Sequence, residues 1–180
     1  MTQLKFCVVF LLTCFIGRWF AYDAASSVSF YALVTAPGTF MHELAHYVAA
    51  MLTNGNPTGL SIIPTNDSLG RVYVIPNWYN AALIGTAPLL LAPLTLLFMV
   101  LAARRSLATE LISFLLLSYL AACCWAACIP SSADMSIAFS QPLSWLFALP
   151  ALALSAWLTV FLSFKLLRFR HATIDNARRS

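Results

Sequence analysis

The chain has 180 residues, of which 61% are hydrophobic and only 9% are charged. Soluble globular proteins carry about 25% charged residues, so this composition does not fit a water-soluble fold and indicates an integral membrane protein. The formal net charge of +4 comes mainly from basic residues beside apolar runs, as in membrane anchors, and we expect no nucleic-acid partner.

We predict an all-α, multi-pass (polytopic) membrane protein with about five transmembrane helices and a short β-hairpin. A single integral membrane domain covers residues 1–180, with a core at 27–148, a hairpin at 58–77 and a basic tail at 165–180. The expected surroundings are the lipid bilayer of a cell membrane or inner membrane.

The first apolar run covers residues 4–21. Its basic start at Lys5 also fits a cleaved signal peptide. We favour an uncleaved helix, because the aromatic and charged stretch Arg18–Asp23 is a poor cleavage site and a good interfacial anchor.

The second span is predicted at residues 27–53. Pro37-Gly38 should kink or briefly unwind it, and Thr39 could restart the helix as an N-cap. The helix should end in Asn54–Pro57, with Gly55 suited to the left-handed cap.

Residues 58–77 have the pattern of strand, turn and strand. Leu60–Ile63 and Arg71–Ile75 are the predicted strands, and Pro64–Gly70 is the turn. Because a lone hairpin is only marginally stable in water, we expect this one to lean on the helices or to lie in the membrane interface.

Three more spans follow, at 80–102 (broken by Pro88 and Pro93), 107–128 and 143–168. Arg104-Arg105 and the basic tail lie two crossings apart and therefore on the same side, which the positive-inside rule makes cytoplasmic. Alternation then predicts the hairpin on the opposite side.

The five cysteines lie in apolar runs and are expected to be small buried residues.

His42, Glu43 and His46 form an H-E-x-x-H motif inside the second predicted span. The two histidines lie four residues apart, so they project from one helix face and can bind one tetrahedral metal ion. Glu43 is rotated about 100° from His42 and is expected to be the general base that takes a proton from water. Ionisable groups in a membrane helix are costly and indicate a functional site.

A catalytic zinc ion normally has three protein ligands. Asp134, between the fourth and fifth predicted spans, is the preferred third ligand, because Ser131 or Ser132 could cap a helix there and fix it in the first turn. Glu110 is the rival, although Arg104 or Arg105 offers it a simpler partner.

These residues resemble the site-two protease family of intramembrane zinc metallopeptidases. The resemblance covers roughly residues 30–140 and is carried by His42–His46, Asp134, the hairpin and Gly85–Pro88, which is similar to that family's Gly/Pro-containing helix. The chain departs from the family in Ala45, where glycine is frequent, and in Met135, where many members have an Asp-Gly pair.

The resemblance implies a zinc metalloendopeptidase that hydrolyses peptide bonds of a membrane-embedded protein or peptide substrate. His42, His46 and Asp134 would hold Zn²⁺. The strand residues Arg71, Val72, Tyr73, Val74 and Ile75 could hold an unwound substrate by edge pairing. The family's active site usually opens toward the cytosol, unlike the hairpin side that the charges predict here.

The alternative is a non-catalytic metal-binding membrane protein, either an inactive scaffold relative or a transporter component. A transporter should show further polar residues along a path through the spans, and outside the motif the spans are nearly free of them.

Overall fold

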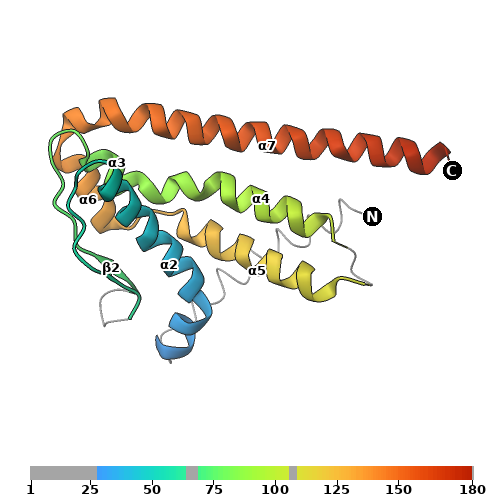
Figure 1. Cartoon of the computed structure of the whole chain (residues 1–180), viewed down its shortest axis with the longest axis horizontal. Helices are drawn as coiled ribbons and strands as arrows, with labels where there is room; N and C mark the ends of the chain where they lie inside the picture. Colours follow the sequence, from blue (N-terminus) through green and yellow to red (C-terminus); the bar gives the residue numbers. More distant parts are fainter. Residues whose placement is uncertain (1–27, 64–68, 106–108, 180) are drawn as a thin grey trace.

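The structure is a computed structural model that describes residues 28–63, 69–105 and 109–179. The predicted first span at 4–21 and most of the hairpin turn, residues 64–68, lie outside the described residues. The described chain is mostly helical and has one small antiparallel sheet (Figure 1). The coarse prediction of a helical protein with a hairpin after the motif helix is therefore confirmed.

Helix α2 extends over Val28–Leu52 and carries the motif. It continues through Pro37, so the predicted unwinding and restart at Thr39 are wrong. The next residue, Gly38, lies directly against the backbone of α5. A Cβ atom at Gly38 would be only 2.8 Å from the Cys123 carbonyl oxygen, so the absence of a side chain lets the two helices approach closely.

The end of α2 also differs from the prediction. Asn54 takes the left-handed conformation, with φ of 59°, and Gly55 does not. The Gly55 N–H donates to the Ala50 carbonyl at 2.7 Å. A Cβ atom at Gly55 would lie 2.8 Å from Ile84 Cδ1 and 3.1 Å from Ala50 Cβ. Gly55 is thus needed for close packing, while asparagine tolerates the left-handed turn.

The hairpin consists of β1 (Leu60–Ser61) and β2 (Arg71–Val72), paired antiparallel with Leu60 opposite Val72. Both strands are shorter than predicted, but backbone hydrogen bonds from Thr58 N to Tyr73 O and from Ile75 N to Gly55 O, each 2.8 Å, prolong the pairing.

The predicted support of the hairpin by helices is confirmed. Val74 packs against an apolar cluster that joins α2 to the following helices. The buried members of that cluster are Ala49, Ala50, Ile84 and Ala87.

The predicted span at 80–102 is built from α3 (Ala81–Thr86), the 3₁₀-helix η2 (Ala87–Leu91) and α4 (Ala92–Ala103). The break falls at the two predicted prolines, since Pro88 lies in η2 and Pro93 in the first turn of α4. Residues 81–103 together are long and apolar enough to cross a membrane.

Helix α5 (Leu111–Ala127) leads into α6 (Ser132–Ser140) through a bend of 50°. The 3₁₀-helix η3 (Pro142–Ser144) then leads directly into α7 (Trp145–Arg179).

Within the described ranges, two stretches (81–103 and 142–164) are long and apolar enough to span a membrane, or three if the bent pair α5–α6 is one span. Helix α2 does not reach that threshold; His42, Glu43 and His46 are among the residues that lower its hydropathy. The total of about five spans stays a prediction.

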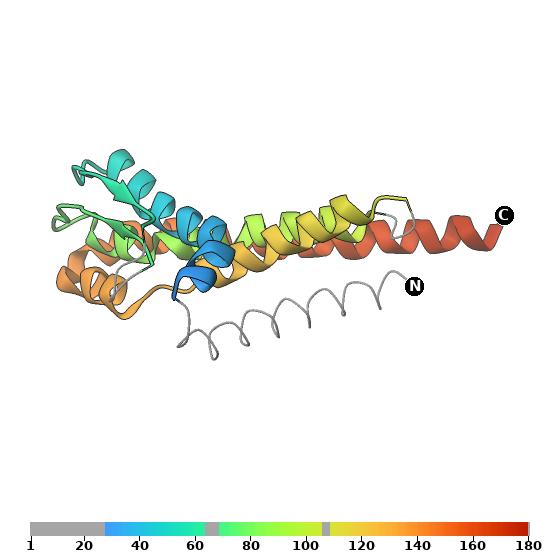
Figure 2. The same ribbon diagram turned by 90° about the horizontal axis from the view of Figure 1, so that it is seen from below.

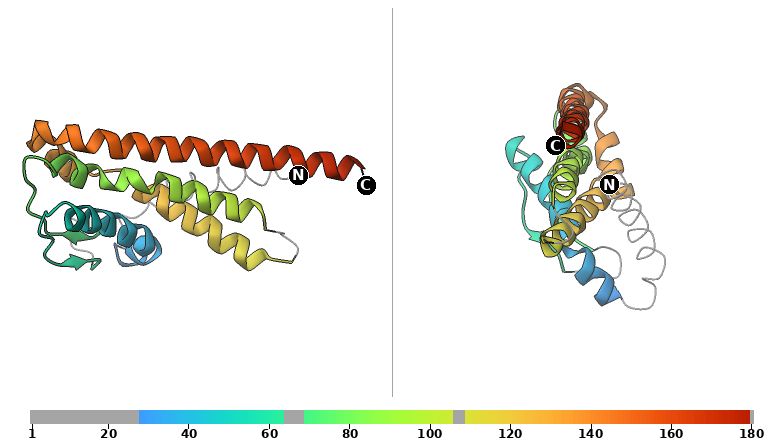
Figure 3. Two further views of the ribbon diagram at one scale, coloured as in Figure 1. Left: turned by 45° about the horizontal axis from the view of Figure 1, so that its top comes forward. Right: turned by 90° about the vertical axis from the view of Figure 1, so that its right-hand side faces the viewer.

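Helices α4, α5 and α7 lie side by side along the long axis of the molecule (Figures 1 and 2). Helix α3, helix α6 and the hairpin gather with α2 around one end of α4 and α7, and the C-terminus lies at the far end (Figure 3). The motif is therefore placed at one end of an elongated helical bundle.

Candidate metal centre

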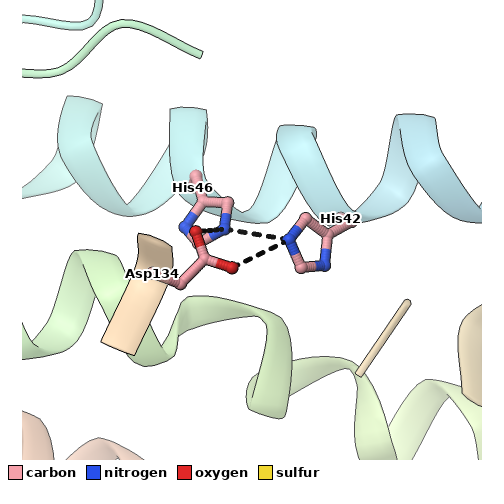
Figure 4. A group of neighbouring side chains, drawn as sticks. All are labelled: His42, His46 and Asp134. Atoms are coloured by element: carbon pink, nitrogen blue, oxygen red, sulfur yellow. Dashed lines mark hydrogen bonds and ion pairs between the residues drawn. The ribbon is translucent and has the colours of Figure 1, made fainter. Parts of the chain in front are cut away.

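His42 and His46 of α2 and Asp134 of α6 come together with their side chains turned toward one another (Figure 4). Each offers one donor atom, and these atoms all lie within 4.8 Å of one another. The two histidines come from successive turns of α2 and the carboxylate from the first turn of α6. These three residues could hold a metal ion.

The side-chain nitrogens and oxygens of the three residues lie close together. His42 Nε2 lies 3.2 Å from Asp134 Oδ2 and 3.2 Å from His46 Nε2, and His46 Nε2 lies 3.1 Å from Asp134 Oδ1. Zinc–nitrogen bonds of about 2.0–2.1 Å in tetrahedral geometry separate neighbouring donors by roughly 3.3 Å. The separation of the two nitrogens agrees with that value, and each nitrogen lies at a similar distance from one of the two carboxylate oxygens of Asp134.

Backbone carbonyls fix the orientation of both imidazole rings. His42 Nδ1 lies 2.9 Å from the Ala127 carbonyl oxygen of α5, and His46 Nδ1 lies 2.7 Å from the Ile84 carbonyl oxygen of α3. A carbonyl oxygen can only accept, so Nδ1 of each ring must carry the proton and donate it. In the neutral rings, Nε2 then presents a lone pair toward the shared centre, as in zinc sites whose histidines donate to outer partners.

The chemistry of this donor set fits a divalent metal. Two Nε2 lone pairs and the Asp134 carboxylate converge, and all of them are acceptors when the rings are neutral. Protonating both rings instead would place two positive charges on nitrogens 3.2 Å apart, which is unfavourable. A metal ion removes this conflict because all three groups donate electron pairs to it.

The first turn of α6 aims the Asp134 carboxylate. Ser131 is the N-cap: its hydroxyl accepts from Asp134 N at 3.2 Å, and Ser131 N donates to Asp134 Oδ2 at 2.6 Å. This capping box confirms the predicted cap. It holds the carboxylate through one oxygen and so limits its rotation.

Gly85 allows α6 to approach α3 closely enough to bring Asp134 to the histidines. A Cβ atom at Gly85 would overlap the Asp134 carbonyl oxygen and would lie 2.8 Å from both Ala138 N and Ala138 Cβ. The neighbouring Ile84 carbonyl holds His46, so one turn of α3 positions two of the three candidate ligands.

The centre is partly open to its surroundings. The side chains of His42 and Asp134 are 16% and 13% exposed, whereas that of His46 is 7% exposed. Glu43, half-buried, lies close enough to interact electrostatically with all three. The hairpin covers Glu43, because a Cβ atom at Gly70 would lie 2.7 Å from Glu43 Cγ and 2.9 Å from Glu43 Oε1.

The rival third ligand lies elsewhere. Glu110 pairs with Arg105 at 2.8 Å, as the sequence suggested, and does not join the histidine cluster. Cys123, Cys124 and Cys128 are buried, as predicted, and belong to no metal-binding group among the described residues.

Sequence reasoning missed the two carbonyl acceptors and the glycines at positions 70 and 85. The acceptors lie 85 and 38 residues from the histidines that they orient, and a backbone carbonyl leaves no mark in the sequence. Gly85 belongs to the Gly85–Pro88 stretch that carried part of the resemblance, which was the available signal for it.

Comparison of the chain with known protein families, with curated proteins and with solved structures finds no match.

Proposed function

We propose that this protein is an intramembrane zinc metalloendopeptidase that hydrolyses peptide bonds in or near the membrane. The observation that carries the proposal is the convergence of His42, His46 and Asp134 beside Glu43, with both histidine Nε2 atoms turned inward. Three nitrogen and oxygen donors with room for water are typical of catalytic zinc, whereas structural zinc sites use four protein ligands.

His42, His46 and Asp134 would hold the zinc ion, and a bound zinc supplies Lewis acidity that polarises the substrate carbonyl and acidifies water. The proton transfer falls to Glu43. Glu43 would take the proton of the attacking water and later deliver it to the leaving amine.

The outer edge of β2 is the proposed place for the unwound substrate. Tyr73 O and Ile75 N bond to the segment that precedes β1, so Val72 and Val74 direct their backbone N–H and C=O groups to the opposite edge. An extended peptide could pair with those groups.

The segment that contains β2 lies along α2. It contacts α2 beside Glu43, at Gly70, and again at Val74, which packs against the cluster that contains Ala49 and Ala50. A peptide paired with this edge would therefore run alongside α2 and past the metal centre. In this proposal Arg71, Tyr73 and Ile75 act mainly by holding the strand in place.

A membrane location is supported by the two stretches that are long and apolar enough to span the bilayer. Large side chains along α7 are widely exposed, among them Leu154, Trp157 and Phe161, and the rings of Trp157 and Phe161 stack at 5.4 Å. Lipid contact would remove this apolar surface from water.

The proposal is tested by comparing Glu43→Gln with Glu110→Gln, a matched change of a carboxylate outside the cluster. With purified protein and membrane-embedded test peptides, we expect Glu43→Gln to keep its zinc and to lose hydrolysis, while Glu110→Gln retains both. Normal cleavage by Glu43→Gln would contradict the mechanism. A non-catalytic scaffold or transporter component, the alternative class, would tolerate the change.

A further inference from the structure

The two ends of the described part of the chain differ in their content of lysine and arginine. Arg104 and Arg105 follow α4 at the end opposite the candidate metal centre, and α7 runs to the same end (Figure 1). The last 15 residues of α7 carry Lys165, Arg168, Arg170, Arg178 and Arg179. Among the described residues away from this end, Arg71 in β2 is the one lysine or arginine.

One bilayer thickness separates these two ends. Ile84, whose carbonyl holds His46, and Arg104 are joined by α3, η2 and α4. About 20 residues of nearly continuous helix rise by about 30 Å, which is also the thickness of the hydrocarbon core, about 30 Å. His42 is held by Ala127, and the neighbouring Cys128 contacts Thr95 at 3.7 Å, so the centre lies between the levels of Ile84 and Thr95. When the arginines lie at one face of the membrane, the metal centre therefore lies in the half of the span nearer the other face.

Helix α7 repeats this arrangement independently. It starts at η3, where Ser144 Oγ accepts a hydrogen bond from Ala82 N of α3 at 2.8 Å. Its apolar stretch ends at Phe164, and the basic residues begin directly afterwards. Two separate spans thus place the metal centre and the basic residues toward opposite faces.

The end with the metal centre carries the features of a membrane–water interface. Trp78 and Tyr79 contact Phe147 with ring centroids 6.0 Å and 6.2 Å apart, and Trp78 is exposed. Tryptophan and tyrosine are enriched at interfaces, on either side of the membrane. The aromatic residues thus mark this end as interfacial, and the basic residues decide which side it faces.

We infer that the metal centre and the hairpin face the non-cytoplasmic side of the membrane. Lysine and arginine near the ends of spans are retained in the cytoplasm, and acidic residues contribute little to this rule. The substrate is then a peptide segment that reaches the site from the non-cytoplasmic interface, and metal loading occurs from that compartment. The orientation deepens the proposed peptidase function, on which its substrate class rests.

Cysteine labelling of the full-length protein in intact cells tests the orientation. Ser61→Cys in β1 and Thr109→Cys beside Arg105 are exposed positions at the two ends, and neither belongs to the metal centre. The described native cysteines are buried, so the parent chain provides the background. With a membrane-impermeant maleimide, we expect labelling of Ser61→Cys in intact cells and of Thr109→Cys only after permeabilisation.

Labelling of Thr109→Cys in intact cells, or of Ser61→Cys only after permeabilisation, would overturn the orientation. Fusions to the C-terminus of the unmodified chain give a second readout that requires no substitution. A fluorescent protein should be bright there and alkaline phosphatase inactive, and active phosphatase would overturn the inference. Reversed labelling with Glu43-dependent hydrolysis would reject the orientation alone, whereas the expected labelling without hydrolysis would reject the peptidase proposal alone.

Discussion

Replacing Gly85 by alanine should weaken zinc binding, because the backbone of α6 lies where the new methyl group would be placed. The Cβ atom would be 2.8 Å from Ala138 Cβ and would overlap the Asp134 carbonyl oxygen. Carbon atoms pack at about 3.5–4.0 Å, so α6 must move away from α3 by roughly 0.7 Å or more. Asp134 moves with it, since the capping box ties its carboxylate to the first turn of that helix.

The expected loss of zinc affinity follows from how little displacement of a ligand a metal site tolerates. Ligand distances in functional zinc sites agree with ideal values to about 0.2 Å, well below the expected displacement. We therefore expect zinc affinity to fall by at least the 10–100-fold that accompanies loss of a supporting contact. Stability should fall as well: helix propensity favours alanine by about 1 kcal/mol, but overpacking costs about 1–3 kcal/mol.

A metal-competition titration of purified protein measures the zinc affinity, and thermal unfolding of the same samples measures the stability. Ala102→Val is the control, because Ala102 is fully buried against Phe114 and lies far from the centre. It should lower the unfolding temperature and leave zinc affinity unchanged. A folded Gly85→Ala protein that binds zinc as tightly as the parent would refute the reasoning.

Gly70→Ala should keep its zinc, and its kcat should fall by about 100-fold because the general base is displaced. The new Cβ atom would lie 2.7 Å from Glu43 Cγ and 2.8 Å from Thr39 Cγ2. Adding Thr39→Ser, which removes that methyl group, should restore part of kcat; unchanged kcat in Gly70→Ala itself would contradict the contact. Asn80→Ala should destabilise the protein by about 1–3 kcal/mol, because the fully buried Asn80 side chain donates to the Thr53 carbonyl at 2.9 Å. Thermal unfolding checks this value, and an unchanged unfolding temperature would show that the hydrogen bond contributes little.

The features that the sequence predicted correctly are local in the chain. The spacing of His42 and His46 sets one helix face, and Ser131 lies three residues before the Asp134 that it caps. Glu110 likewise forms an ion pair with Arg105, which lies five residues away in the sequence. In each case, helix geometry or chain proximity alone brings the groups within reach of each other.

The failures arise where distant packing decides the outcome. The local rules for proline predicted a kink or a brief unwinding at Pro37; the unwinding does not occur, and the helix continues through Pro37 into Gly38, which contacts α5. Gly55 was assigned a turn role from its conformational freedom, yet it is required by Ile84, which lies 29 positions later. No periodicity in the sequence reports such contacts, and the same holds for the carbonyls that orient the histidines.

The zinc content of purified protein, measured by elemental analysis across matched variants, tests the central claim most directly. We predict about one zinc ion per chain in the parent protein and in Glu110→Ala, and loss of the metal in His42→Ala, His46→Ala and Asp134→Ala. Full zinc occupancy in Asp134→Ala, or its loss in Glu110→Ala, would contradict the metal centre described for His42, His46 and Asp134.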